Sequence, residues 1–349
     1  NVITYPSTFV IYKNGKIKYG VNAAIEWDNP ELIEKIKKLL KYETAGHPIN
    51  GLKWSRKTTE KIARELNAIG ISVSPNTVCR LLKKMGYSLK VNHKKLESGI
   101  KNPPDPQQRD EQFRYIADLR EQFAKQNNPI ISVDTKKKDL IGNFKNNGTS
   151  WQQDPIVVND HDFPSDARGK AIPYGIYDTQ RNTGTIFLGT SRDTPKFAVE
   201  SIETWWKTEG RKQYPKSKKL LILADSGGSN SCRSRVWKYR IQKKLCNQFG
   251  LTVNVSHYPP GSSKWNPIEH RLFCEISKNW SGRPLDSYET ALKYIRTTKT
   301  ISGLKVKARF VKQKYKTGEK ISNIQMKSLP IKKYEKLPKW NYSLSPSKM

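Results

Sequence analysis

Two short apolar runs, each ending on an aspartate, constrain the fold of this chain more than any other feature of its sequence. Pro129–Val133 and Lys219–Ala224 consist almost entirely of apolar residues, and both are predicted to be strands buried on two faces. Apolar residues with helical spacing follow over residues 195–207 and 235–249. This alternation of buried strands and helices predicts an α/β domain with a central sheet.

A third acidic residue belongs to a helix that begins after the strand-breaking stretch Tyr258–Gly261. Ile268, Leu272 and Ile276 recur every fourth residue and predict one apolar face. Glu269 comes directly after Ile268, so its carboxylate is expected at the rim of the core.

The three acids Asp134, Asp225 and Glu269 lie at two strand ends and on a later helix. Converging carboxylates repel one another unless a cation neutralises them, and carboxylate oxygens suit magnesium. Cleavage and rejoining of phosphodiesters uses two divalent cations about 4 Å apart. The alternative stays open at this point, because strand-end aspartates often cap turns and a helical glutamate is most often solvated.

The charge of the chain indicates a polyanionic partner. The sequence carries 64 Lys and Arg against 31 Asp and Glu, a formal net charge of +33. Nucleic acid is the first candidate, with ribosomal or membrane-surface binding as alternatives. No apolar run approaches the roughly 20 residues that a membrane span needs. We therefore expect a cytoplasmic, nucleoid-associated protein with no membrane partner and no small-molecule substrate.

Residues 55–91 predict a helix-turn-helix. Thr58–Ala68 is a short amphipathic helix ended by Gly70, and Ser74-Pro75 supplies a cap and a first-turn proline for a second helix. The outward positions of the second helix are polar or cationic, as expected in a major groove: Asn76, Thr77, Arg80, Lys83 and Lys84. Tyr87–Val91 is a candidate first strand of a wing. An ordinary helical hairpin is the alternative.

The remaining periodic segments predict a hairpin at Ser7–Lys18, helices at Asp28–Lys41 and Arg109–Lys125, and strands at Ile141–Phe144, Tyr174–Tyr177, Thr185–Leu188 and Leu251–Val255. We expect the Lys-rich segment Lys305–Met349 to lie on DNA or to remain disordered. The expected regions are an unassigned segment 1–28, a helix-turn-helix domain 29–100, a Pro-rich joint and linking helix 101–128, a catalytic domain 129–282 and a basic extension 283–349.

Several long blocks resemble the DDE transposases of bacterial insertion sequences, specifically the Rhodopirellula-transposase group. They include VDTKKKDLIGNFKNNG from Val133, FAVESIETWW from Phe197, LLILADSGGSN from Leu220 and HYPPGSSKWNPIEHRLF from His257. The resemblance extends from about residue 40 to about residue 310 and includes Gly51–Leu89. It implies a ribonuclease H-like, integrase-like mixed sheet flanked by helices, preceded by the helix-turn-helix domain.

The resemblance also implies an activity and its site. Asp134, Asp225 and Glu269 would be the catalytic acids and the ligands of two Mg²⁺ ions, with Mn²⁺ able to substitute. The expected enzyme is a polynucleotidyl transferase that binds terminal inverted repeats and cuts and joins double-stranded DNA, as a homo-oligomer on that DNA. Two alternatives remain: a catalytically inactive or host-recruited helix-turn-helix DNA-binding protein, and a nuclease of the ribonuclease H fold.

Six further residues are candidates for supporting roles near the acids. Lys136, Lys137 and Lys264 are candidate contacts to the DNA backbone, with solvated charge as the alternative. His161, Asp162 and His270 are candidate accessory residues. His270 follows Glu269 and should point about 100° away from it on a helix, so a substrate-phosphate or structural contact is expected there.

Overall fold

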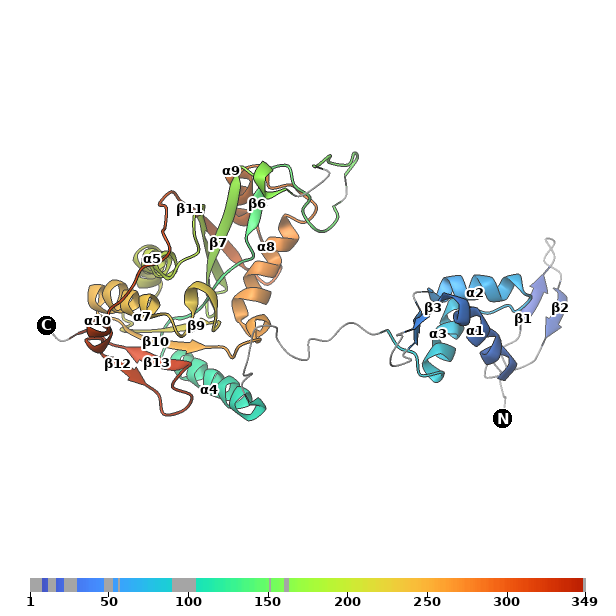
Figure 1. Cartoon of the computed structure of the whole chain (residues 1–349), viewed down its shortest axis with the longest axis horizontal. Coiled ribbons are helices and arrows are strands. Elements are labelled where there is room, and N and C mark those ends of the chain that lie inside the picture. Colours follow the sequence, from blue (N-terminus) through green and yellow to red (C-terminus); the bar gives the residue numbers. More distant parts are fainter. Residues whose placement is uncertain are drawn as a thin grey trace. The chain divides into compact units, whose positions relative to one another are not determined.

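The computed structural model describes residues 8–11, 17–21, 30–46, 53–55, 57–89, 105–150, 152–159 and 163–347. The chain divides into two units, Asn1–Lys95 and Leu96–Met349 (Figure 1). No helix of the described residues is both long enough and apolar enough to cross a bilayer.

The described residues of the first unit form three helices and two small antiparallel strand pairs. Its elements are β1 (Thr8–Ile11), β2 (Ile17–Val21), α1 (Pro30–Glu43), β3 (Thr44–Gly46), β4 (Lys53–Ser55), α2 (Thr59–Ala68) and α3 (Pro75–Lys84). β1 pairs with β2, which confirms the predicted hairpin, and β3 pairs with β4, which the sequence did not predict. The helices share one core, to which Leu32, Ile36, Ile62, Leu66, Val78 and Leu81 contribute.

The two helices of the predicted helix-turn-helix begin and end where the sequence places them. The Thr58 side chain accepts from Lys61 N and the Ser74 side chain from Thr77 N, so each helix has a hydroxyl cap. Gly70 lies between the helices with φ +85°, which favours glycine. The predicted wing strand is not found over residues 87–89, and Lys90 and Val91 lie outside the described residues.

The second unit holds a nine-stranded mixed sheet with helices on both faces. Its strands are β5 (Ile130–Thr135), β6 (Asp139–Ile141), β7 (Gly169–Asp178), β8 (Thr183–Gly189), β9 (Lys219–Ala224), β10 (Thr252–His257), β11 (Lys305–Val311), β12 (Ile331–Lys333) and β13 (Asn341–Leu344). Its α-helices are α4 (Pro106–Lys125), α5 (Pro195–Trp205), α6 (Arg211–Gln213), α7 (Arg235–Ile241), α8 (Cys274–Asn279), α9 (Tyr288–Arg296) and α10 (Asn323–Lys327). Short 3-10 turns are η1 (Pro164–Asp166), η3 (Gly228–Asn230) and η5 (Ser263–Trp265), and π-helical turns are η2 (Trp206–Gly210), η4 (Gln242–Asn247) and η6 (Glu269–Phe273).

The strand order is β11-β8-β7-β5-β9-β10-β13-β12, with β6 paired to β7. β5, β9 and β10 are parallel, whereas β7 is antiparallel to both β5 and β8. The strand predicted at Ile141–Phe144 is found at Asp139–Ile141 instead, and it pairs with β7. This mixed sheet flanked by helices confirms the predicted ribonuclease H-like α/β fold class.

Alternate residues of the central strands serve two different cores, which explains their uninterrupted apolar sequence. Ile222 packs with α5 and α7 on one face, whereas Leu221 and Leu223 pack with α4 on the other. Next to α4, the helix η6–α8 and α9 cover β7 and β8. Figure 1 shows α4 on the side of β9 and β10 away from α5 and α7.

The C-terminal residues are folded, so the expectation of a disordered tail is wrong for residues 305–347. β11 adds to β8 at one edge of the sheet, and β13 and β12 extend it beyond β10 at the other. The linking helix α4 also packs on the sheet, beginning three residues before the predicted Arg109 because Asp105 caps it and Pro106 opens its first turn.

Candidate active site

The two strand-end aspartates are neighbours because β5 and β9 are parallel and in register. Val133 is the register partner of Ala224, and Asp134 and Asp225 are the residues that follow these two in the sequence. Adjacent strands lie about 4.8 Å apart. Both carboxylates therefore project from the same edge of the sheet.

Glu269 reaches this edge because its helix lies unusually close to the sheet. Gly175 is the register partner of Asp134, and a Cβ there would lie 2.5 Å from Phe273 Cε1 and 2.8 Å from Ile268 Cδ1. The absence of a side chain at Gly175 thus allows η6 to pack directly on β7. Glu269 itself is half-buried, beside the fully buried Ile268, and it opens a π-helical turn.

A buried polar contact holds the start of this helix on β5. Ser132 Oγ accepts from Ile268 N at 3.0 Å and donates to Asn266 Oδ1, while Asn266 Nδ2 donates to Val133 O at 3.3 Å. Asn266 and Ser132 are fully buried. These bonds join the segment that carries Glu269 to the strand that ends on Asp134.

Burial disfavours the charged forms of all three acids, and repulsion by neighbouring carboxylates adds to this effect at Asp134 and Asp225. Burial is the main cause of the raised pKa of Asp134, followed by the negative charge of Asp225 and then that of Glu269. Burial also raises the pKa values of Asp225 and Glu269, and the Glu269 carboxyl lies within hydrogen-bonding range of Asp134. The three acids predicted from the sequence therefore interact directly.

A fourth acid, Asp193, lies beside them and was missed by the sequence analysis. Its Oδ1 accepts from Thr135 Oγ1 at 3.1 Å and its Oδ2 lies 3.8 Å from Lys138 Nζ. Its charge contributes to the raised pKa values of both Asp134 and Asp225. β8 runs parallel to β5, so the loop that follows β8 returns to the same edge of the sheet as Asp134. The hairpin predicted over these residues therefore already indicated that an acid in this loop could lie near Asp134.

The donor set fits divalent cations that prefer oxygen ligands. Asp225 Oδ1 is buried and has no hydrogen-bond partner in the part of the chain that the structure describes. An unpaired buried carboxylate oxygen is costly unless a cation or water meets it. Among the described residues, no group of three His, Cys, Asp or Glu side chains is arranged so that it could hold one metal ion. Magnesium needs only one or two carboxylates beside its waters, so pairs of these acids suffice.

The basic candidates near the acids differ in exposure. Lys136 is buried, with its ammonium 3.2 Å from Asp139 Oδ2 and 4.4 Å from the Trp280 ring centroid, so little of its side chain is exposed and its contact with DNA remains a prediction. Lys137 and Lys264 are exposed. His270 is exposed and its Nδ1 donates to Lys264 O at 3.0 Å, a structural contact of the kind expected. His161 and Asp162 lie outside the described residues.

The predicted DNA-facing residues of α3 lie on its outer side. Asn76, Arg80, Lys83 and Lys84 are exposed and Thr77 is half-buried, whereas Val78 and Leu81 fill the core of the first unit. DNA contact by this face remains a prediction.

The family of the chain is decided by a match along most of its length. A model of the Rhodopirellula transposase DDE domain matches residues 35–346. The chain belongs to this family of DDE transposases. No curated protein matches this transposase.

Solved structures of Mos1 transposase are similar to part of this transposase. A Mos1 paired-end complex with the left transposon end has 14% identity and a TM-score of 0.41, covering 75% of this chain and 69% of that one. A Mos1 mariner paired-end complex with Mn has 15% identity and a TM-score of 0.42, with the same coverage. A mariner Mos1 paired-end complex with Mg has 14% identity and a TM-score of 0.39, covering 78% and 72%. These low scores carry no functional argument.

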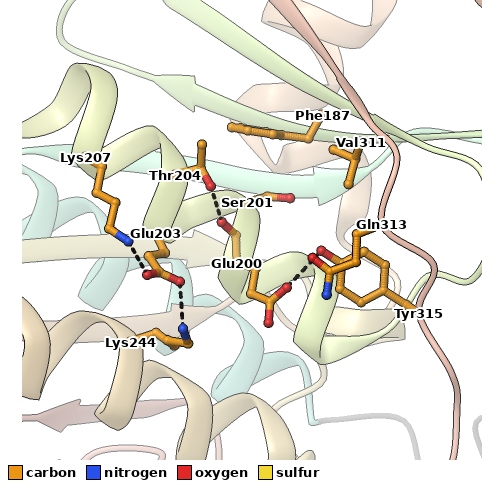
Figure 2. Close-up of a pocket in the computed structure, with 10 residues that line it drawn as sticks. All are labelled: Phe187, Glu200, Ser201, Glu203, Thr204, Lys207, Lys244, Val311, Gln313 and Tyr315. Atoms are coloured by element: carbon orange, nitrogen blue, oxygen red, sulfur yellow. Dashed lines mark hydrogen bonds and ion pairs between the residues drawn. The ribbon is translucent and has the colours of Figure 1, made fainter.

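A cavity of about 350 Å³ in the second unit of the transposase is separate from the acidic site. It is lined by residues of α5, η2 and η4, by Phe187 of β8 and by Val311, Gln313 and Tyr315, and none of the three acids lines it (Figure 2). Within it, Glu203 lies 2.6 Å from Lys207 Nζ and 3.4 Å from Lys244 Nζ, and Glu200 accepts from Tyr315 OH. Both glutamates that line the cavity are thus paired with other lining residues.

Proposed function

We propose that Asp134, Asp225 and Glu269 form the catalytic site at which this transposase cuts and joins DNA strands. One observation carries the proposal: two register-matched strand ends and a closely packed helix bring three acids together in a family of DDE transposases. Their raised pKa values and the unpartnered Asp225 Oδ1 support a site that a cation completes.

The acids would act as ligands, and the rest of the site would fix their positions. Asp134, Asp225 and Glu269 would supply the carboxylate oxygens that hold the ions. When bound, two Mg²⁺ or Mn²⁺ ions would activate the attacking hydroxyl and neutralise charge developing on the phosphate. Thr135 N, which donates to Asp134 Oδ1 at 2.7 Å, and the Ser132–Asn266 contact would hold the ligands in place.

The substrate that we propose is double-stranded DNA, at the element ends and at the target. The polar outer face of α3 would bind the terminal inverted repeats, with Arg80 and Lys83 among its exposed cations. Lys137 and Lys264, both exposed, would contact backbone phosphates near the acids. Joining two ends to one target would require more than one copy of the chain on the DNA.

Strand transfer tests the proposal. The full chain is incubated with a labelled fragment carrying the inverted repeat that flanks its coding region, a target plasmid, and Mg²⁺ or Mn²⁺. We expect cleavage that leaves a 3′-hydroxyl, followed by joining of that end to the plasmid, and loss of both with Asp225→Asn. Cleavage without joining would identify a nuclease instead. End binding without any cleavage would identify a DNA-binding protein with an inactive core.

A further inference from the structure

The C-terminal strand β13 lies directly beside β10, the strand that lies between Asp225 and Glu269 in the sequence. It pairs antiparallel with β10, with Tyr342 opposite Val255 and Asn341 opposite Ser256. Asn341 is fully buried and Tyr342 almost so. Both side chains therefore belong to the interior of the second unit, and their polar groups need partners there.

Tyr342 is joined to Asp225 through a buried histidine. His257 is the last residue of β10 and the register partner of Ala224, the residue before Asp225. Its Nδ1 lies 2.8 Å from Asp225 O, and its Nε2 lies 3.1 Å from the Tyr342 hydroxyl. Trp237 Nε1 lies 3.0 Å from the same hydroxyl.

With a neutral imidazole, only one arrangement of hydrogen atoms satisfies the hydrogen bonds that link Trp237, Tyr342, His257 and Asp225. Asp225 O can only accept, so His257 Nδ1 carries the hydrogen. Nε2 is then an acceptor, which requires the Tyr342 hydroxyl to donate to it while accepting from Trp237 Nε1–H. The His257 ring is fully buried, and burial disfavours its charged form. The bonds run in one direction, from Trp237 through Tyr342 and His257 to Asp225 O.

A second set of buried bonds fixes the backbone of His257. Gln112 of α4 and Asn341 of β13 pair through their amides, with Gln112 Nε2 donating to Asn341 Oδ1 at 2.9 Å and Asn341 Nδ2 donating to Gln112 Oε1 at 2.6 Å. Gln112 Nε2 also donates to His257 O at 2.9 Å. The ring and the carbonyl of His257 are thus both held by groups that include residues of β13.

We propose that His257 and Tyr342 are positioning residues that hold the backbone of Asp225 and so set the affinity of the acidic site for divalent cations. The C-terminal strand is then a support of the active site, although it lies far from the acids in sequence. This inference rests on the proposed function. Among the described residues, one carboxylate oxygen of Asp225 has no hydrogen-bond partner. The orientation of this carboxylate therefore depends on how the backbone of Asp225 and its other carboxylate oxygen are held.

Removal of one oxygen atom tests the inference. Tyr342→Phe leaves His257 Nε2 and Trp237 Nε1–H buried without a partner, while the ring still fills its space. We expect Mn²⁺ affinity of the full chain, measured by the EPR signal of free Mn²⁺, to fall about tenfold, as for outer-shell partners of metal ligands. Half-maximal strand transfer should need correspondingly more Mg²⁺, with the rate at saturating Mg²⁺ within about threefold of the parent.

The matched control is Tyr315→Phe. Tyr315 is also buried in the same core, and its hydroxyl donates to Glu200 Oε2 at 2.9 Å, away from the acids. This variant should lose comparable thermal stability and keep parental Mn²⁺ affinity. An equal change of Mn²⁺ affinity in both variants, or no change in Tyr342→Phe, would overturn the inference.

Variants of His257 distinguish a positioning role from general destabilisation. They also test the inference if Tyr342→Phe fails to fold. Asn at position 257 can place an amide N–H close to where Nδ1–H lies, whereas Ala cannot. We expect Mn²⁺ affinity to decrease in the order parent, His257→Asn, His257→Ala. Equal affinities of His257→Asn and His257→Ala would contradict the positioning role. A parent protein that binds Mn²⁺ but transfers no strand would refute the proposed function alone.

Discussion

At the scale of single residues, Asp134 and Asp225 keep protons in the folded protein at pH values where the unfolded chain has lost them. Burial and neighbouring charges raise both pKa values, so the folded state binds more protons than the unfolded state. Without divalent cations, the free energy of unfolding should therefore decrease as the pH rises from about 4 through neutrality. Added Mg²⁺ replaces the protons, so its stabilising effect should increase with pH.

Thermal unfolding in EDTA and in Mg²⁺, between about pH 5 and pH 8, measures this effect. Asp134→Asn removes the carboxyl whose pKa is raised to about 8, mainly by burial, and should flatten the pH dependence in EDTA. A stabilisation by Mg²⁺ that is independent of pH would contradict a site made of these acids.

At the scale of elements, the glycine of β7 decides how close Glu269 comes to Asp134. Gly175→Ala would place a methyl against Phe273 and Ile268, and such overpacking typically costs about 1–3 kcal/mol. We expect strand transfer to fall more than the loss of folded protein explains, because η6 must move away from β5 and β7. The double variant Gly175→Ala with Phe273→Leu restores space and should recover activity. Full activity of Gly175→Ala, measured by strand transfer, would show that this close packing is not required.

The exposed face of α3 should govern recognition of the element ends and leave the chemistry intact. Replacing Arg80 and Lys83 by alanine should weaken end binding by about tenfold or more, since specific cationic contacts are each worth roughly 1–3 kcal/mol. Cleavage of a pre-nicked substrate at saturating protein should persist. Lys61→Ala with Arg64→Ala on the exposed side of α2 removes the same charge and is the control. Equal effects of both double variants on end binding, in a mobility-shift titration, would contradict the assignment of α3.

The elements that could be predicted from the sequence are those whose signals are local. The cap at Ser74, the two buried strands and the aspartates at their ends all follow from short patterns, and the structure has them. The site features that were missed depend on pairing between distant segments. Asp193 joins the acids only because β7 and β8 return the chain to the same sheet edge, and Gly175 matters only opposite Phe273.

At the scale of the whole molecule, the C-terminal strands illustrate the same limit. β11 and β12 expose several lysines because they form the two edges of the sheet, so a Lys-rich sequence there was interpreted as a tail. A charge run alone does not distinguish an edge strand from a solvated extension. Partners such as β8 and β13 lie far away in the sequence and leave no local signal.

The net charge of +33 predicts how the whole protein binds DNA without regard to sequence. Each neutralised phosphate adds about −0.9 to the slope of log K against log salt concentration. Several contacts should therefore give a slope of about −4 or steeper in a titration of random-sequence DNA from low to physiological salt. A slope near zero would mean that the charge does not drive binding.

We expect Glu269 to complete a metal-dependent site with Asp134 and Asp225, and the substitution Glu269→Gln tests this role. The substitution keeps size and helix propensity and removes the charge that a cation needs. Strand transfer of a labelled terminal fragment is measured with Mg²⁺ or Mn²⁺, alongside binding of the same fragment. We predict a loss of about a thousandfold or more in strand transfer, because metal-assisted stabilisation is worth several kcal/mol, with nearly parental end binding. Retention of a substantial fraction of parental strand transfer would contradict the role of Glu269.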